Sequence, residues 1–259
     1  MKPNNHSASL TVLFILSIQL ITCIGSLRAC APPESRESNR VAEILLFNGT
    51  GTSPNDVKAI EVILRGMHLT YTSVSSRQLN RMSLSQLMAY RLMIVPGGNY
   101  ITIGNSLTRT VTTNIHNAVQ GGLNYLGICA GGLLAGNAEC NSLNLTSGVR
   151  FGFYGVVNEG IHKAPVMITA MKMPPVEHYW ENGPQFAGWG TVVGEYPDGT
   201  PAVVEGTSGK WWVILCGVHP EAPDKWRRGM NFTTPASVAN AYAGTLIDAA
   251  LHNTWLPHY

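Results

Sequence analysis

The stretch Gly127-Ile128-Cys129-Ala130-Gly131-Gly132 decides how this chain folds. It follows an apolar run, Leu123 to Leu126, that is typical of a buried strand, and it precedes Leu133-Leu134-Ala135, which is typical of a helix start. A cysteine between glycines at such a corner has the form Gly-x-Cys-x-Gly, the cysteine counterpart of a nucleophile elbow. Small neighbours are needed there because the nucleophile sits on a tight, strained turn. The alternative is a glycine-rich turn that carries a buried structural cysteine.

A second stretch supplies the partners that a thiol nucleophile needs. Trp211 to Val218 is typical of a buried strand, and it ends in His219-Pro220-Glu221. A thiol requires a base, and the base requires a group that orients it. One strand end can aim the imidazole of His219 at the sulfur of Cys129 while the carboxylate of Glu221 holds the other ring nitrogen. The two motifs together predict a Cys-His-Glu triad rather than a chance pairing.

These motifs make the sequence resemble the class I glutamine-amidotransferase-like superfamily, whose triad is Cys-His-Glu. The narrower resemblance is to the N-terminal domain of eukaryotic-type biotin–protein ligases, which is also found alone in bacterial proteins. It extends from about Val41 to the C-terminus. Five phrases carry it: Asn48-Gly49-Thr50-Gly51-Thr52-Ser53, Pro96-Gly97-Gly98, Gly121 to Gly131, Tyr179-Trp180-Glu181-Asn182-Gly183 and Gly217-Val218-His219-Pro220-Glu221.

The resemblance implies roles for further residues. The Pro-Gly-Gly loop of this superfamily lies beside the nucleophile, so the backbone N–H groups of Gly97 or Gly98 would form an oxyanion hole together with that of Ala130. Additional candidate contacts to the substrate are Asn99, Tyr100 and Tyr179.

The sequence also departs from glutamine-using relatives. Those enzymes usually follow the elbow with polar residues that help to hold glutamine, whereas this chain has Gly132, Leu133 and Leu134. It contains no second, ammonia-accepting synthase domain and no glycine- and arginine-rich biotinyl-adenylate loop. Biotin ligation is therefore not expected.

Alternating strands and helices predict the fold. Expected strands cover 41–47, 68–74, 92–95 and the run that ends at Cys129, with helices at 53–65, 83–90 and 107–119 between them. This order indicates an α/β fold with a mostly parallel, doubly wound (flavodoxin-like) sheet and helices on both faces. Shorter, Gly-broken strands over 147–204 predict an antiparallel extension, with a hairpin signal at Asn182-Gly183, and a closing helix is expected over 237–252.

Composition limits the possible functions. The chain has 259 residues, of which 45% are hydrophobic and 12% charged, with a formal net charge of +2. This balance indicates a core-rich globular domain, placed at residues 41–259, and gives no basis for nucleic-acid binding. No spacing typical of metal ligands is present, so we expect neither a metal nor another cofactor. Nothing in the sequence predicts an oligomeric state.

The first residues have the features of an export signal. Leu10 to Ile24 is apolar, short for a membrane span and suited to a signal peptide, which predicts removal of residues 1–29. Leu27-Arg28-Ala29-Cys30 resembles a bacterial lipobox, although Arg28 replaces the usual small residue, and 30–40 would form a flexible tether. The expected location is exported, either periplasmic or membrane-anchored through Cys30. An uncleaved anchor or an ordinary signal peptide is the alternative.

If the protein is exported, its compartment affects which of the remaining cysteines stay reduced and which form a disulfide. Cys129 must stay reduced to act as a nucleophile. Cys140 and Cys216 could form a disulfide in an oxidising compartment or remain two separate buried thiols.

The sequence therefore predicts an exported, cysteine-dependent hydrolase that acts on an amide or another C–N bond. Its partner would be a small-molecule or peptide amide. The alternative is a non-catalytic ligand-binding or sensor module on the same fold.

Overall fold

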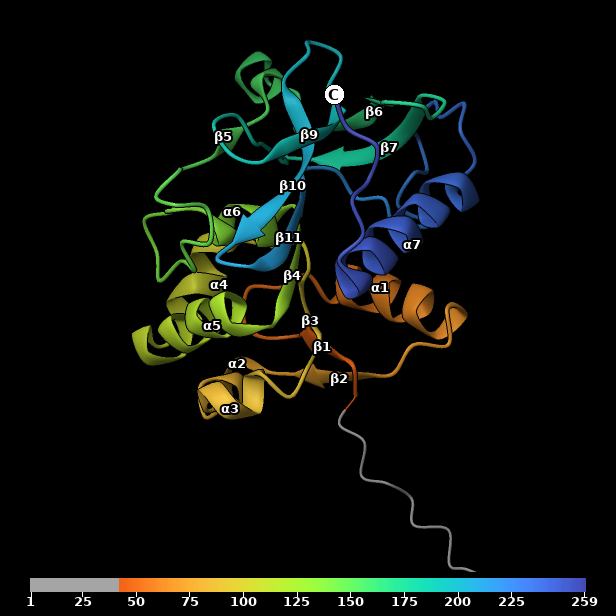
Figure 1. Ribbon diagram of the computed structural model, residues 1–259. Helices are drawn as coiled ribbons and strands as arrows, with labels where there is room; N and C mark the ends of the chain where they lie inside the picture. The colour runs from red at the N-terminus through yellow and green to blue at the C-terminus, as the bar shows by residue number, and fades with distance from the viewer. Residues whose placement is uncertain (1–41) are drawn as a thin grey trace, which may run out of the picture. The chain divides into compact units, whose positions relative to one another are not determined.

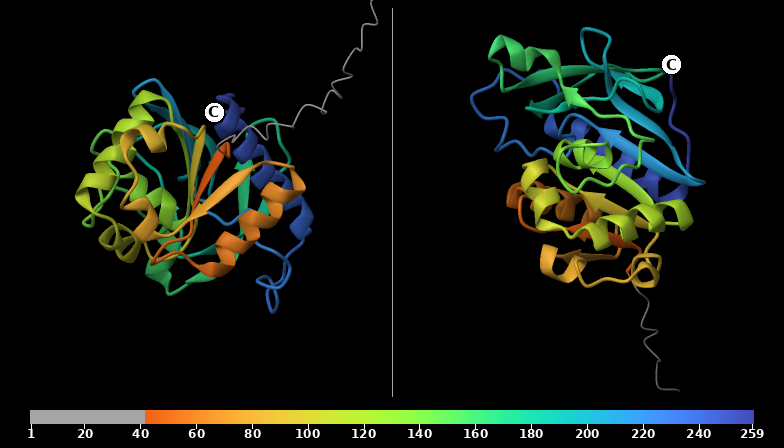
Figure 2. Two further views of the ribbon diagram at one scale, coloured as in Figure 1. Left: turned by 90° about the horizontal axis from the view of Figure 1, so that it is seen from below. Right: turned by 90° about the vertical axis from the view of Figure 1, so that its left-hand side faces the viewer.

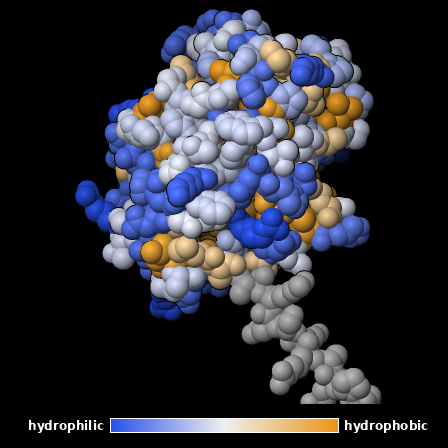
Figure 3. All heavy atoms as spheres, in the orientation of Figure 1, coloured by the Kyte–Doolittle hydropathy of each residue, from blue (hydrophilic) through white to orange (hydrophobic). Residues whose placement is uncertain are grey.

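The computed structural model describes residues 42–259 (Figure 1). The predicted signal peptide, tether and lipobox lie outside the described residues. Within the described part, no helix is both long enough and apolar enough to cross a membrane. On the face drawn in Figure 3, hydrophobic residues are scattered in small groups among hydrophilic ones.

One large sheet organises the molecule. Five neighbouring strands are parallel, and four antiparallel strands continue the sheet beyond them. The parallel strands are, in spatial order, β2 (Tyr71–Val74), β1 (Ile44–Phe47), β3 (Leu92–Val95), β4 (Asn124–Ile128) and β11 (Trp211–Cys216). The antiparallel strands are β10 (Pro201–Ser208), β9 (Thr191–Glu195), β6 (Lys163–Ala170) and β7 (Val176–Glu181). The predicted doubly wound sheet with an antiparallel extension is thus confirmed.

Helices cover both faces of the parallel part (Figure 2). Alternate residues of β1 enter two separate cores, so that Ile44 and Leu46 pack on one side and Leu45 and Phe47 on the other. The first core is closed by α1 (Pro54–Gly66) and α7 (Ala236–His252). The second is closed by α2 (Ser76–Leu79), α3 (Leu84–Leu87), α4 (Tyr100–Ser106), α5 (Arg109–Gly121) and α6 (Ala130–Ala135). A short 3-10 helix, η1 (Gly155–Glu159), and a small sheet of β5 (Gly152–Phe153) and β8 (Pro184–Gln185) complete the fold.

Several local expectations need correction. The strand expected from His68 begins only at Tyr71, because His68 adopts a positive φ of 56° in the preceding turn. Helices α2 and α4 were not expected. The chain does turn at Asn182-Gly183, but no hairpin forms there, since β7 pairs with β6 while β8 pairs with β5.

The expected alternative of two separate buried thiols holds in part, because only Cys216 is buried and Cys140 is partly exposed. Cys140 and Cys216 are both free thiols, so no disulfide joins them. Cys216 is buried at the end of β11, where burial raises the pKa of its thiol to about 12.

Candidate active site

The turn after β4 places Cys129 in a strained backbone conformation. Its φ is 50° and its ψ is −106°, outside the regions that L-residues favour. A Cβ at Gly131 would lie 2.0 Å from the carbonyl oxygen of Val95, and one at Gly127 would lie 2.6 Å from the backbone carbon of Gly131. The backbone N–H of Cys129 is held by the carbonyl of Cys216 at 2.7 Å. Flanking glycines are therefore a steric requirement of this elbow.

Two loops at the same sheet edge are joined beside the elbow. The N–H of Ser53 donates to the carbonyl of Gly97 at 2.9 Å, and the N–H of Asn99 donates to the carbonyl of Gly51 at 2.9 Å. These bonds tie the loop after β1 to the loop after β3. Ser53 also caps α1, accepting a hydrogen bond from the N–H of Asp56. The first turn of α1 is thus fixed next to the end of β11.

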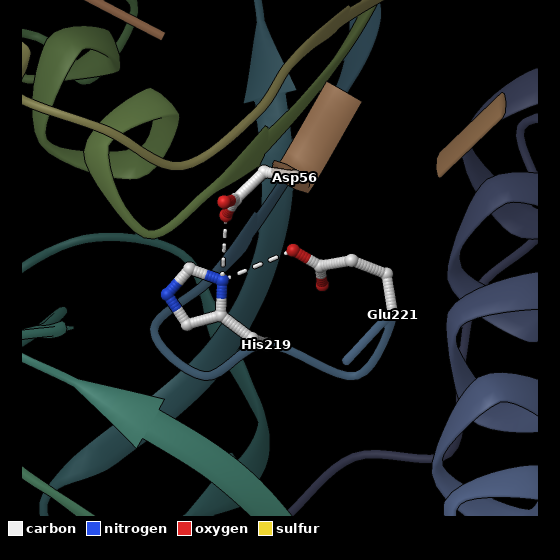
Figure 4. A group of neighbouring side chains, drawn as sticks. All are labelled: Asp56, His219 and Glu221. Carbon is white, nitrogen blue, oxygen red and sulfur yellow. Dashed lines mark hydrogen bonds and ion pairs between the residues drawn. The ribbon is translucent and has the colours of Figure 1, made fainter. Parts of the chain in front are cut away.

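His219 is held by three neighbours. Its backbone N–H donates to the carbonyl of Tyr179 at 2.8 Å. Its ring atom Nδ1 lies 3.0 Å from Oε1 of Glu221 and 3.0 Å from Oδ1 of Asp56. Both carboxylates point at this one nitrogen, whereas the other ring nitrogen, Nε2, points away from them (Figure 4). All three side chains of this group are buried.

Asp56 is the residue that the sequence analysis missed. In the sequence it is an ordinary acidic residue in the first turn of a helix, where such residues favour the helix dipole. Only the joined loops bring it to His219. The nearest sequence signal is the Ser53-Pro54 helix start directly after the Asn48-to-Ser53 phrase.

The charges of this group are coupled. Burial lowers the pKa of His219, but charge interactions with Cys129 and Glu221 and hydrogen bonds with Asp56 and Cys129 raise it well above its usual value. Burial alone would raise the pKa of the Asp56 carboxyl. The hydrogen bond and the charge of His219 have a larger combined effect, so the pKa of Asp56 lies below its usual value. The pKa of Glu221 is raised, chiefly by burial. Asp56 is therefore the firmly ionised partner of an imidazolium.

Gly97 provides the space for this arrangement. A Cβ on Gly97 would lie 2.3 Å from Oδ1 of Asp56 and 2.6 Å from Cε1 of His219. Gly98 and Ala130, in contrast, line the pocket that contains Cys129. Among the residues that the structure describes, the N–H groups of Gly98 and Ala130 have no acceptor. Within residues 42–259, two N–H groups without an acceptor thus belong to residues that line the pocket of Cys129.

Cys129 and His219 open into one pocket with a volume of about 530 Å³. One part of its wall is apolar and the other polar. The apolar part is made of Tyr100, Leu133, Phe153 and Val157, and the polar part includes Asn99, His162, Glu181 and Asn182. This volume lies in the range of small-molecule sites.

The candidate substrate contacts lie in different places. Asn99 and Tyr100 both line the pocket, although Oδ1 of Asn99 also caps α4 by accepting from the N–H of Thr102 at 2.9 Å. Tyr179 is absent from this pocket and lines a smaller hollow beyond His219. His162 and Glu181, which were not predicted, are on the pocket wall.

The donor atoms of Asp56, His219 and Glu221 lie within 4.8 Å of one another, close enough to consider a metal ion. The contact between Nδ1 and Glu221 Oε1 has the length and direction of an N–H···O hydrogen bond. A cation at this position would require Nδ1 to lose that proton. Oε1 of Glu221 forms that hydrogen bond, and Oδ1 of Asp56 faces the same nitrogen at an ion-pair distance of 3.0 Å.

Comparisons with known proteins agree with this fold. Residues 42–144 match the family model "Biotin-protein ligase, N terminal". A glutamine amidotransferase structure is similar, with a TM-score of 0.55 and 18% identity over 69% of this chain and 90% of that one. A Thermoplasma acidophilum protein, provisionally named as a component of GMP synthase, has a TM-score of 0.52 and 11% identity, covering 82% of this chain and 96% of that one. The cytoplasmic protein STM3548 of Salmonella typhimurium has a TM-score of 0.52 and 11% identity, covering 80% of this chain and 98% of that one.

No curated protein matches the sequence. The family model nevertheless supports the resemblance to the biotin–protein ligase N-terminal domain over residues 42–144, and the similar structures share the glutamine-amidotransferase-like fold.

Proposed function

Because the chain has a class I glutamine-amidotransferase-like fold whose residues 42–144 match the biotin–protein ligase N-terminal family, we propose that it is a cysteine-dependent hydrolase of an amide or another C–N bond. The observation that carries the proposal is the setting of His219. Two buried carboxylates hold its Nδ1, and the pKa of its ring is raised by the neighbouring Cys129. This is the arrangement that an activated thiol requires.

The reaction would proceed by acyl transfer. His219 takes the proton of the Cys129 thiol, and the sulfur attacks the carbonyl carbon of the substrate. The C–N bond then breaks, the nitrogen leaves with the proton held by His219, and the acyl group remains as a thioester on Cys129. Water attacks that thioester with His219 as the base, which releases a carboxylic acid and restores the thiol.

The oxyanion of the tetrahedral intermediate would be bound by backbone groups. The N–H groups of Gly98 and Ala130 line the same pocket as Cys129 and have no acceptor among the described residues. Such donors lower the barrier because they are already in place when the charge develops. Gly97 acts differently in this proposal, since its missing side chain leaves room for Asp56 and His219.

The pocket does not favour glutamine or biotinyl-adenylate chemistry. Leu133 occupies the pocket wall directly after the elbow, where a polar group would be needed to hold glutamine. The expected reaction is therefore the hydrolytic half of the amidotransferase reaction, without an ammonia acceptor.

The alternative is a ligand-binding module that keeps the fold without catalysis. A panel of amides, tested with the wild type and with Cys129→Ala, separates the two. We expect hydrolysis that is lost in the variant. Binding of an amide without any turnover by the wild type would favour the module.

We also propose that the protein is exported, on the basis of the apolar run from Leu10 to Ile24. In a bacterial host the mature chain would begin at or near Cys30, with an acyl anchor on that residue. N-terminal sequencing and membrane fractionation test this proposal. An unmodified start elsewhere in a soluble form would remove the anchor and leave export standing.

A further inference from the structure

A second, smaller hollow adjoins the pocket of Cys129. Its volume is about 200 Å³, and Trp226 and Tyr179 line it without Cys129 or Ala130. The two spaces share Ser53, Asp56, Glu181 and His219 as lining residues. His219 thus borders both the pocket that contains the nucleophile and the smaller hollow.

The position of His219 assigns the two spaces to the two halves of a substrate. An acyl carbonyl placed on Cys129, with its oxygen at Gly98 and Ala130, must have its scissile nitrogen near His219, which donates the proton. Substituents on that nitrogen then extend past His219. The smaller hollow is the space that receives them.

Acidic and aromatic groups surround the smaller hollow. Glu181 lines both spaces, and its Oε2 accepts a hydrogen bond from the hydroxyl of Tyr179 at 2.5 Å. No hydrogen bond to its Oε1 is found among residues 42–259. The ring centroids of Tyr179 and Trp226 lie 5.8 Å apart, and those of His219 and Trp226 lie 6.1 Å apart. Carboxylates next to aromatic rings are the groups that bind ammonium ions.

Apart from histidine, no positively charged side chain lines the two spaces that Glu181 borders in the described residues. Among the described residues, neither space has a lysine or an arginine in its lining. The buried carboxylate of Asp56, which borders both spaces, adds negative charge. A leaving group with a carboxylate would be repelled, whereas one with an ammonium group would be attracted.

Resting on the proposed hydrolase function, we propose that the smaller hollow selects substrates whose leaving amine carries a second, positively charged amino group. The acyl side, lined by Leu133, Phe153 and Val157, accepts an aliphatic acyl chain. The substrate class is therefore the N-acylated short diamine.

Three matched hexanoyl amides test this selection by their kcat/KM. Their leaving groups are 1,5-diaminopentane, hexylamine and 6-aminohexanoate, which differ only in the terminal ammonium, methyl and carboxylate. We expect the cationic amide to exceed the neutral one by about tenfold, as one charge-assisted contact allows, and the anionic one to be slowest. Glu181→Gln should reduce this preference to roughly twofold. Glu159→Gln removes an exposed carboxylate outside both linings and should leave the preference unchanged.

A binding measurement separates this inference from the hydrolase proposal. Calorimetric titration with free 1,5-diaminopentane requires no turnover. Binding that Glu181→Gln weakens about tenfold, together with no hydrolysis of any amide, would overturn the hydrolase and keep the cation site. Hydrolysis of the three amides at equal rates, or diamine binding that Glu181→Gln does not change, would overturn the cation site.

Discussion

Oδ1 of Asp56 lies 3.0 Å from Nδ1 of His219, although one residue opens the first helix and the other follows the last strand. Glu221 reaches the same nitrogen at the same distance. Nδ1 carries a single proton, which is hydrogen-bonded to Oε1 of Glu221, while Oδ1 of Asp56 faces the same nitrogen as an ion-pair partner. The imidazole is consequently oriented by two acids, of which Asp56 is the firmly ionised one.

The contact of both acids with one nitrogen predicts redundancy between them. Asp56→Asn and Glu221→Gln should each lower turnover by about tenfold, with Asp56→Asn costing at least as much, and the double variant should lose on the order of 10³-fold or more. The upper limb of the pH–rate profile should move to lower pH in Asp56→Asn, because the imidazolium loses its ionised partner and its pKa falls. Asp248→Asn, an exposed acid on α7, is the control. Wild-type turnover and an unchanged profile in Asp56→Asn would make Asp56 a structural residue only.

The thiols should differ in reactivity. Alkylation by iodoacetamide near neutral pH, followed by peptide mass spectrometry, should label Cys129 first. Cys216 should stay unlabelled, since it is buried and its pKa is about 12, and Cys140, whose pKa burial also raises, should react slowly. His219→Asn should slow the labelling of Cys129 by about tenfold or more, because the base is lost.

His252→Asn, an exposed histidine on α7, is the matched control for that labelling experiment. Equal labelling rates of Cys129 in the His219→Asn and His252→Asn variants would show that the imidazole does not activate the thiol.

The absence of a side chain at Gly97 should be essential for activity, because it leaves room for Asp56 and His219. In Gly97→Ala the new methyl group would displace Asp56 and His219, since their atoms lie 2.3 Å and 2.6 Å from its position. We expect a folded protein that has lost most of its turnover, on the order of 10²-fold as for a misplaced base. Gly66→Ala at the end of α1 meets no atom within 4 Å and should be active. Circular dichroism checks folding, and full activity of folded Gly97→Ala would refute this role.

The buried carboxyl of Glu205, which lies outside the candidate active site, should make the stability of the fold depend on pH. It is buried on β10 and accepts hydrogen bonds from the N–H of Leu256, at 3.0 Å and 3.3 Å, while burial raises its pKa from 4.5 to about 7. Between these values the folded state binds more protons than the unfolded state, so the contribution of Glu205 to stability falls as pH rises. Glu205→Gln should therefore gain Tm over the wild type at about pH 8 and lose that gain near pH 5. An equal difference at both pH values would contradict the raised pKa.

Local patterns were sufficient for much of the fold. The run Leu92–Val95 forms β3 with the predicted bounds, and Ser53 caps a helix that begins at Pro54 as expected. These segments are specified by apolar runs and by capping chemistry, which act over a few residues. The same holds for the turn at Cys129, whose glycines leave few other conformations.

Features that depend on distant contacts were not predictable. Helix α4 follows Pro96-Gly97-Gly98, which indicates a loop, and its cap by Asn99 becomes visible only in the fold. No hairpin forms at Asn182-Gly183 because the strands on its two sides find other partners, β6 for β7 and β5 for β8. The position of Asp56 depends on hydrogen bonds between two loops that no local pattern specifies.

Burst kinetics with p-nitrophenyl hexanoate test most directly whether Cys129 and His219 form an acyl-transfer pair. We predict a rapid release of about one equivalent of nitrophenolate per chain, with the hexanoyl group found on Cys129 by mass spectrometry and removed by hydroxylamine. The burst should be absent in Cys129→Ala and slowed by about 10²-fold in His219→Asn. A wild-type protein without a burst, or a burst of the same rate in His219→Asn, would contradict the account.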